Sequence, residues 1–412
     1  MAERTSIAPS SEALFALLRA HPVTTRTELV QLSGLSKATV SEAIASLMAL
    51  GLLEEVGKRQ PGRGRSQVVL ALRPMTRLVL GAHYTEGACR VVLADLLASP
   101  IAQAGRSLHS TEPEAFVEAI VSCVEELLPQ ADAPVVGLGA GTPGLIDATR
   151  REVMISVPQQ WFHVPLGAML EERLGMPVVL ANRAKAAALG EYWQGHPEVR
   201  ASAGGRPSSL FYAYVGAGIV AGFVNDGELY LGSGGAAGEL GHVTVLPDGP
   251  VCGCGNRGCL HTLASEAAIV RQVKARLRAV GQPDPGDDRR ISLARMDMAM
   301  VVDEARQENP VVLEVLQEVA AWLGIAIAGA INLLNPSRVV IGGPVTGIGP
   351  PFIDALREEI RRRALWDSLQ DVSIEGSVLG DDAGPIGAAA LFLDLAHPRD
   401  LMTATGMTIP SS

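Results

Sequence analysis

Three cysteines and one histidine in the middle of the chain could together hold a metal ion. His242 is followed by Cys252, Cys254 and Cys259, so all four residues fall within 18 positions. Three thiolates and one imidazole form a tetrahedral zinc-ligand set, and because four protein ligands leave no open position, such a site is structural. The alternative is a glycine-rich loop with incidental thiols, but free cysteines rarely cluster without a ligand to hold. The spacing therefore predicts one zinc ion per chain.

Motifs around these cysteines resemble the signature of the ROK family, which contains repressors and bacterial sugar kinases. In chain order they are Val215-Gly-Ala-Gly-Ile219, Asp226-Gly-Glu-Leu-Tyr-Leu-Gly232, Gly238-Glu-Leu-Gly-His242 and Cys252-Gly-Cys-Gly-Asn-Arg-Gly-Cys-Leu260. The resemblance extends from about Leu78 to a last helix near Leu395. It implies an α/β body with an actin-like (ribonuclease H-like) two-lobed fold and a sugar site in the cleft. In the sugar-binding members of the family, the glutamate and histidine at the positions of Glu239 and His242 bind sugar hydroxyls. The other nitrogen of that histidine binds zinc together with the cysteines.

The net charge of −10 is unevenly distributed over the 412 residues. Residues 1–75 carry nine Lys and Arg against six Asp and Glu, whereas the remainder carries 25 against 38. A basic head on an acidic body indicates that only the head binds a polyanion. We therefore expect a DNA-binding domain over 1–75, two lobes over 76–200 and 201–398, with the cysteines in the second, and a C-terminal tail over 399–412.

Nothing in the sequence is typical of a secreted or membrane protein. The first ten residues are polar, unlike a signal peptide. The longest apolar stretch, Val319 to Leu334, is shorter than a membrane span and ends at Asn-Pro, so we expect a buried helix and no membrane association. Thiolate ligands without a disulfide pattern indicate a reducing, cytoplasmic environment.

The first 75 residues predict a winged helix-turn-helix. Helices are expected over Ser11–Ala20, Arg26–Leu32 and Lys37–Leu50, with Thr25 and Ser36 as N-caps and Gly34 in the turn. In the third helix the apolar residues recur at helical spacing, which leaves Lys37, Thr39 and Ser41 on the outer side, close to the capping Ser36. Small polar and basic side chains at this end of a recognition helix contact base edges and phosphates of double-stranded DNA.

A basic hairpin follows the third helix. Strands expected over Leu52–Val56 and Gln67–Leu72 flank a loop with four cations and three glycines, whose arginines Arg63 and Arg65 suit a wing that enters a minor groove. The head resembles a MarR-like winged helix, and on a ROK-like body it describes the repressor branch of that family. The residues also allow a helical protein-interaction module with a charged loop. Because one winged helix makes few base contacts, we expect a homodimer or homotetramer on its operator.

The positions that serve phosphoryl transfer in kinases of the family are altered. At the first phosphate turn the family's aspartate corresponds to His83, and its two glycines correspond to Thr85 and Glu86. Side chains there block the approach of backbone amides to phosphate. The catalytic aspartate that follows Asn182 corresponds to Arg183, which is permanently charged and cannot accept a proton. We therefore expect a body that is not an enzyme.

A ligand site is expected to persist. Asn182, Glu239 and His242 are kept, whereas Arg183 and His261 replace two carboxylates of the family. An arginine at the position of the catalytic base can hold a phosphate or carboxylate by paired hydrogen bonds. Three alternatives stay open: an anionic sugar-like effector, a neutral sugar, and no small ligand. The sequence thus predicts a transcriptional regulator of carbohydrate-related genes. Its rivals are a ROK sugar kinase with an extra DNA-binding domain and a ligand-independent interaction protein.

Overall fold

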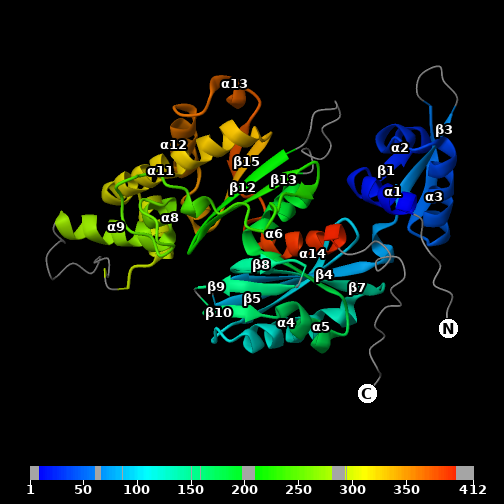
Figure 1. The fold of residues 1–412 in the computed structure, drawn as a ribbon, viewed down its shortest axis with the longest axis horizontal. Coiled ribbons are helices and arrows are strands. Elements are labelled where there is room, and N and C mark those ends of the chain that lie inside the picture. Colours follow the sequence, from blue (N-terminus) through cyan, green and yellow to red (C-terminus); the bar gives the residue numbers. More distant parts are fainter. Residues whose placement is uncertain are drawn as a thin grey trace. The chain divides into compact units, whose positions relative to one another are not determined.

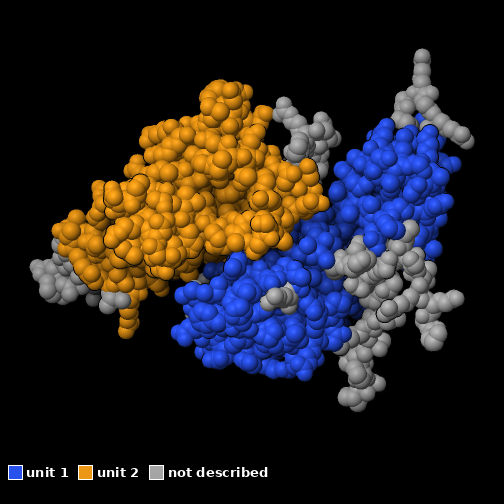
Figure 2. All heavy atoms as spheres, in the orientation of Figure 1, with its two compact units in different colours: residues 1–205, 382–412 blue, residues 206–381 orange. Residues whose placement is uncertain are grey.

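The chain forms two compact units (Figure 2). The computed structural model describes residues 9–60, 66–85, 87–149, 151–157, 159–196, 209–280, 293 and 295–395. Unit 1 comprises residues 1–205 and 382–412, and unit 2 comprises residues 206–381. The last helix therefore packs in unit 1, because its small residues lie directly against the sheet of that unit. From the sequence it was expected in the second lobe.

Unit 1 begins with the winged helix-turn-helix that the sequence predicts. Its elements are α1 (Pro9–Ala20), β1 (Val23–Thr25), α2 (Arg26–Ser33), α3 (Lys37–Ala49), β2 (Leu53–Arg59) and β3 (Gln67–Leu72). The strands form an antiparallel sheet in the order β1-β3-β2, in which β1 was not expected from the sequence. Leu14, Leu18, Leu29, Ile44 and Leu47 are fully buried between the helices.

Local capping sets the helix boundaries of this domain. The Glu28 carboxylate accepts a hydrogen bond from the Thr25 backbone N–H (2.8 Å), and the Thr25 hydroxyl accepts one from the Glu28 N–H (3.3 Å). This reciprocal capping box satisfies N–H groups that have no partner within the helix. At the other end of α2, Gly34 has φ +66°, a left-handed conformation that only glycine adopts without cost. These contacts position α3, the expected recognition helix.

The remainder of unit 1 is a five-stranded mixed sheet with helices on both faces (Figure 1). In the spatial order of the sheet its strands are β11 (Val178–Asn182), β7 (Val135–Thr142), β4 (Leu78–Thr85), β5 (Ala88–Ala94) and β6 (Pro100–Ser107). α4 (Pro113–Leu127) and α5 (Leu166–Leu174) lie on one face, and α6 (Arg183–Gly190) and α14 (Ala383–Leu395) lie on the other. A π-helical turn, η3 (Glu191–Gly195), extends α6. A small antiparallel sheet comprises β8 (Leu145–Asp147), β9 (Glu152–Ser156) and β10 (Trp161–Val164).

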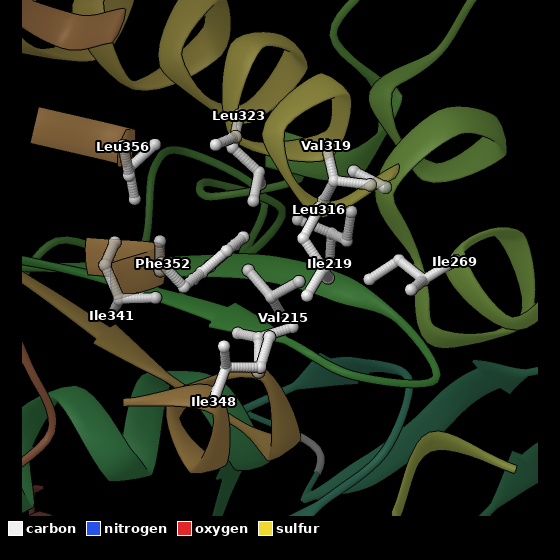
Figure 3. Close-up of a cluster of buried hydrophobic side chains, with 14 of the residues drawn as sticks. Val215, Ile219, Ile269, Leu316, Val319, Leu323, Ile341, Ile348, Phe352 and Leu356 are labelled. Atoms are coloured by element: carbon white, nitrogen blue, oxygen red, sulfur yellow. The ribbon is translucent and has the colours of Figure 1, made fainter. Parts of the chain in front are cut away.

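Unit 2 is a second five-stranded sheet covered by helices. In spatial order its strands are β14 (Glu228–Leu229), β13 (Ile219–Asn225), β12 (Ser209–Val215), β15 (Arg338–Gly342) and β16 (Ser373–Gly376). Its helices are α8 (Leu260–Ala264), α9 (Glu266–Ala279), α10 (Met298–Arg306), α11 (Pro310–Leu334), α12 (Pro350–Arg361) and α13 (Trp366–Leu369). Figure 3 shows the core, where Val215, Ile219 and Ile341 of the strands meet Leu316, Val319 and Leu323 of α11.

The described residues include one helix, α11, that is long and apolar enough to cross a membrane. It has 25 residues, and 56% of its most apolar window is buried inside the protein. Val315, Val319 and Ile327 of this helix are fully buried in the core of unit 2. The helix that the sequence predicted over Val319–Leu334 lies within α11 and is buried over most of its length, although Leu333 and Leu334 at its end are exposed.

Candidate functional site

The first turn of α3 presents a basic and hydroxyl-rich surface. Ser36, Lys37 and Ser41 are exposed, and Thr39 is half-buried. The Ser36 hydroxyl accepts a hydrogen bond from the Thr39 N–H (3.2 Å), which caps the helix, and the Ser41 hydroxyl donates to the Lys37 carbonyl (2.8 Å). On the opposite side of α3, Val40 and its helical neighbours are buried. The helix therefore turns its apolar side inward and its polar N-terminal side to solvent, as a DNA-reading helix must.

The wing hairpin carries a further exposed cation, Arg59. β2 and β3 pair in antiparallel fashion with an irregularity at Glu55 and Gly57. The side chain of Arg59, at the end of β2, is 67% exposed and lies 3.5 Å from Glu28, a long and solvent-exposed ion pair that leaves the guanidinium accessible. Arg63 and Arg65, the arginines predicted to enter a minor groove, lie outside the described residues.

The predicted metal ligands of unit 2 lie together. His242, Cys252, Cys254 and Cys259 each offer a ligand atom, and these atoms all lie within 4.8 Å of one another. The Cys254 and Cys259 sulfurs are 3.7 Å apart, and the Cys252 sulfur is 3.7 Å from the His242 Nδ1. Two ligands about 2.3 Å from a tetrahedral zinc ion are separated by about 3.8 Å. The donor set therefore fits zinc in both chemistry and spacing, with His242 Nδ1 as the histidine donor.

A tight backbone turn helps to bring these ligands together, and their proximity shifts the pKa values of the thiols. Gly258 adopts φ +64°, and a methyl group on it would lie 1.5 Å from the Leu246 carbonyl oxygen, so this position requires glycine. A hydrogen bond with the Asn256 backbone is the main cause that lowers the pKa of Cys254 to about 7. Burial, followed by the neighbouring thiols, raises the pKa of Cys259 to about 11. Crowded thiols of this kind resist joint ionisation unless a cation compensates their charge.

Two predicted effector residues lie near this cluster. The rings of His261 and His242 are 6.2 Å apart between centroids, and His261 is half-buried on α8. Burial first, and then the charge of His242, lower the pKa of His261, so its imidazole is neutral at physiological pH. Glu239 is exposed, and its backbone carbonyl accepts a hydrogen bond from the His242 N–H (3.0 Å). Unit 2 thus combines an accessible carboxylate and a neutral imidazole beside the metal-ligand cluster.

The other two predicted effector residues begin α6 in unit 1. The Asn182 side chain accepts a hydrogen bond from the Ala184 N–H (2.9 Å) and donates to the Gly144 carbonyl (2.9 Å). It therefore caps α6 and fixes the turn after β7. Arg183, half-buried, is the first residue of the helix. Because a helix N-terminus carries partial positive charge, a cation there is favoured only when an anion lies nearby.

The altered phosphate turn contains a buried histidine. His83, on β4, is 7% exposed. A methyl group on Gly384, at the start of α14, would lie 2.3 Å from its Nδ1, and one on Gly141 would lie 2.8 Å from the same atom. Burial, followed by the positive charges of Arg183 and Arg90, lowers the pKa of His83 to about 3. A neutral imidazole therefore packs against the glycines of β7 and α14. Glu86 lies outside the described residues.

Two glycines of unit 2, Gly216 and Gly342, are packed against tyrosines. A methyl group on Gly342 would lie 1.8 Å from the Tyr212 hydroxyl oxygen, and one on Gly216 would lie 2.7 Å from the Tyr214 ring. Tyr212 is buried. In this structure the two glycines make room for aromatic rings, a packing role that glycine spacing alone does not reveal.

Arg19 of α1 is buried and paired, a role that was not expected from the sequence. Its guanidinium forms an ion pair of 2.6 Å with Asp394 of α14, and the arginine side chain is 3% exposed. One local signal existed, because Arg19 falls on the buried stripe of α1 with Ser11, Leu14, Phe15 and Leu18. A cation on the apolar stripe of a short helix needs a partner from elsewhere in the fold. The identity of that partner, 375 positions away, is not readable from spacing.

Comparison with known proteins identifies both parts of the chain. A sequence model of the ROK family matches residues 91–395, and one of the MarR family matches residues 8–66. The xylose repressor of Caldicellulosiruptor bescii is 30% identical over 378 residues, which span 90% of this chain and 92% of the repressor. The glucokinase of Streptomyces coelicolor is 33% identical over 306 residues, which span 70% of this chain and 88% of the kinase.

A solved structure extends the comparison to the fold. The crystal structure of a ROK family transcriptional regulator, a homologue of the E. coli Mlc protein, superposes with a TM-score of 0.77 at 26% identity. The match covers 95% of this chain and 96% of the regulator. The two-part architecture predicted from the sequence, a winged helix-turn-helix on a sugar-kinase-like α/β body, is thereby confirmed.

Proposed function

The chain belongs to the ROK family, and we propose that it is a DNA-binding transcriptional repressor of carbohydrate-related genes whose body responds to a sugar. The observation that carries this proposal is a MarR-type winged helix with an exposed, basic first turn of α3, joined to a ROK body. The matched repressor and regulator share nearly the full length of the chain, whereas the matched glucokinase shares 70% of it.

The DNA interface that we propose combines α3 and the wing. Lys37 would neutralise a phosphate while Ser36, Thr39 and Ser41 approach base edges in the major groove. Arg63 and Arg65 would contact the adjacent minor groove, where arginines favour narrow, electronegative segments. A homodimer or homotetramer would place two such heads on a two-fold operator. Binding to a chromosomal operator also places the protein in the cytoplasm.

The effector residues that we propose lie at the positions that bind sugar in the family. Asn182, Glu239 and His242 match the family there, whereas Arg183 and His261 replace carboxylates. Glu239 and His242 would bind ring hydroxyls, as would the neutral His261, because carboxylates and imidazoles are strong partners for hydroxyl groups. Asn182 would keep the turn after β7 in place. Arg183, at the positive end of α6, would hold a phosphate or carboxylate of an anionic sugar by paired hydrogen bonds.

We propose further that the body does not transfer phosphoryl groups. Arg183 cannot serve as a general base, and loss of such a base alone slows catalysis roughly 10²- to 10⁴-fold. The buried, neutral imidazole of His83 provides neither a metal-binding carboxylate nor space for phosphate against Gly141 and Gly384. These features favour a repressor over the rival reading, a sugar kinase with an extra domain.

Zinc is the metal that we propose for unit 2. His242 Nδ1 and the sulfurs of Cys252, Cys254 and Cys259 would hold it, and the ion would supply structural cross-linking without an open coordination position. The ligand histidine also ends the short helix η4 (Leu240–His242), whose N-cap is Glu239. Zinc binding would therefore fix the position of Glu239, and loss of the metal would impair the effector response as well as stability.

Fluorescence anisotropy with the full-length protein tests the proposed function. The probe is labelled DNA from upstream of the protein's own gene, titrated at several salt concentrations, with D-xylose, D-glucose and glucose 6-phosphate as candidate effectors. We expect specific binding that weakens with salt and is released by at least one of these compounds. A coupled assay for sugar-dependent ATP turnover on the same preparation should show no activity. Sugar-dependent turnover without specific DNA binding would favour the kinase reading.

A further inference from the structure

One buried arginine joins the winged helix to the body within unit 1. Arg19 lies in the last turn of α1, and its Nε donates a hydrogen bond to the Leu96 carbonyl (3.0 Å). Its Nη1 donates to Asp394 of α14 (2.6 Å), and its guanidinium carbon lies 4.4 Å from the ring centroid of Trp193, in the π-helical turn η3. A single side chain of the DNA-binding domain thus contacts three separate segments of the body.

Two of those body segments, the turn at Leu96 and η3, are also hydrogen-bonded to each other. The Asp95 carboxylate accepts hydrogen bonds from the N–H groups of Leu97 and Ser99, which fixes the turn that presents the Leu96 carbonyl to Arg19. Gln194, the neighbour of Trp193, donates to the Leu97 carbonyl (2.8 Å). We call the contacts of Arg19 with Leu96, Trp193 and Asp394 the joint. The body residues of the joint are held in place by their own hydrogen bonds, and only Arg19 comes from the winged-helix domain.

Two of the three segments end helices that begin at the candidate effector site. α6 starts at Arg183 and continues through η3 to Trp193. α14 starts at Ala383, beside the ring of His83, and carries Asp394 in its last turn. A methyl group on Gly141 would lie 2.8 Å from His83 and 3.5 Å from the Cα of Arg183, so the first turns of both helices meet around the same strand end.

The two helices touch through their backbones. A methyl group on Gly387 of α14 would lie 1.7 Å from the Ala186 carbonyl oxygen, and one on Gly190 of α6 would lie 2.1 Å from the Ala383 carbonyl oxygen. Contacts this close leave no room for independent sliding, because packed interiors resist compression and shift as units. A displacement at the first turn of either helix is therefore expected to carry Trp193 and Asp394 together.

We propose that Arg19 is the positioning residue that couples effector binding in the body to the orientation of the DNA-reading helix. This inference rests on the proposed function. An effector bound at Asn182 and Arg183 would shift the pair of helices α6 and α14. This shift would move the helix ends that hold Arg19 and, with them, helix α1. Because α1 packs against α3, the movement would reach the DNA-reading helix. Arg19 donates its hydrogen bonds to Leu96 and Asp394, which belong neither to the proposed DNA surface nor to the proposed effector residues, so we assign it a role in transmission.

Three constants of the full-length protein separate transmission from binding. They are the Kd for operator DNA, the Kd for the effector by calorimetry, and the factor by which saturating effector weakens DNA binding. The effector probe is whichever of D-xylose, D-glucose and glucose 6-phosphate releases the wild type most strongly. Coupling between two sites is typically about 5- to 150-fold. For Arg19→Gln and Asp394→Asn we expect both Kd values within about threefold of wild type and a coupling factor close to one.

Arg106→Gln is the matched control. It removes an ion pair of similar length, 2.7 Å from Arg106 to Glu126, within the same unit but away from the joint, and should keep the wild-type coupling factor. If Arg19→Gln does not fold, Trp193→Phe and Arg19→Lys loosen the joint more gently and should lower coupling by an intermediate factor. Wild-type coupling in folded joint variants overturns the inference while the proposed function stands. If none of the three probes changes operator binding by the wild type, the proposed sugar response is wrong and so is this inference.

Discussion

In the winged-helix domain, Ser36 and Ser41, which we assign to DNA binding, are exposed, and a hydrogen bond within one helical turn fixes each of them. In the body, the side chains that we assign to sensing and structure depend on residues far away in the chain. His83 packs against Gly384, and Cys259 lies fully buried. We therefore expect variants of the winged-helix domain to change DNA affinity with little effect on folding, and variants of the body to reduce stability first.

The largest loss of stability is expected at the cysteine cluster. Cys259→Ser should remove the zinc ion, whose structural sites contribute on the order of 10 kcal/mol in small peptides. Even part of that loss should lower the melting temperature markedly, by roughly 2–4 °C per kcal/mol in a domain of this size. Metal analysis should find one zinc per wild-type chain. Cys123→Ala, at a buried cysteine outside the cluster, should keep its zinc. Zinc below half an equivalent in unchelated wild type would refute the site.

The next effect concerns acid stability and His83. The unfolded chain binds a proton at this histidine below about pH 6.5, but the folded chain, with its pKa lowered to about 3, does not. Stability should therefore fall as pH drops below 6.5, by on the order of 2 kcal/mol at pH 5. His83→Asn should be less stable than wild type at pH 7.5, and this difference should shrink at pH 5. Urea unfolding of both proteins at the two pH values measures it, and an equal difference at both would contradict burial of a neutral imidazole.

Wing variants should leave stability unchanged and alter salt dependence. The double variant Arg63→Ala with Arg65→Ala removes two phosphate or minor-groove contacts per protomer. The slope of log K against log salt should flatten by about 1.8 per protomer. Arg278→Ala with Arg361→Ala, which removes two exposed cations of the body, is the matched control and should keep the wild-type slope. Normal operator binding by the wing double variant at every salt concentration would show that the wing does not contact DNA.

At the N-cap of α3 we expect a loss of stability smaller than those at Cys259 and His83. Ser36→Ala removes the acceptor for the Thr39 N–H and should cost about 1 kcal/mol. Ser36→Asp restores the cap and should keep wild-type stability, but its negative charge should weaken operator binding about tenfold or more. Thermal unfolding and anisotropy on the two variants separate the roles. Equal DNA affinity for both would mean that this turn does not face phosphate.

Local sequence signals predicted the local parts of the molecule. The capping box at Thr25, the left-handed Gly34 and the Ser36 cap lie where the sequence placed them, because each depends on residues within four positions. The cysteine cluster was predictable because its four metal-binding side chains fall within 18 positions of the sequence. Strand β1 was missed because three residues carry no periodicity, and their pairing with β3 is long-range.

Long-range packing set the rest. The last helix joins unit 1 through contacts of Gly139 with Ala388 and of Gly137 with Phe392, which connect residues about 250 positions apart. The joint at Arg19 has the same character. Its partner Asp394 is 375 positions away, and only the presence of a cation on an apolar stripe hinted that a partner was needed.

The effect of sugar on operator binding by the full-length wild type most directly tests whether the protein is a sugar-responsive repressor. Anisotropy of the labelled upstream DNA should rise with protein at nanomolar to micromolar concentrations, and an added sugar or sugar phosphate should reverse that rise. We expect release by at least one compound among D-xylose, D-glucose and glucose 6-phosphate, at unchanged ionic strength. Specific operator binding that is indifferent to every one of them, or the absence of specific binding, would contradict a sugar-responsive repressor.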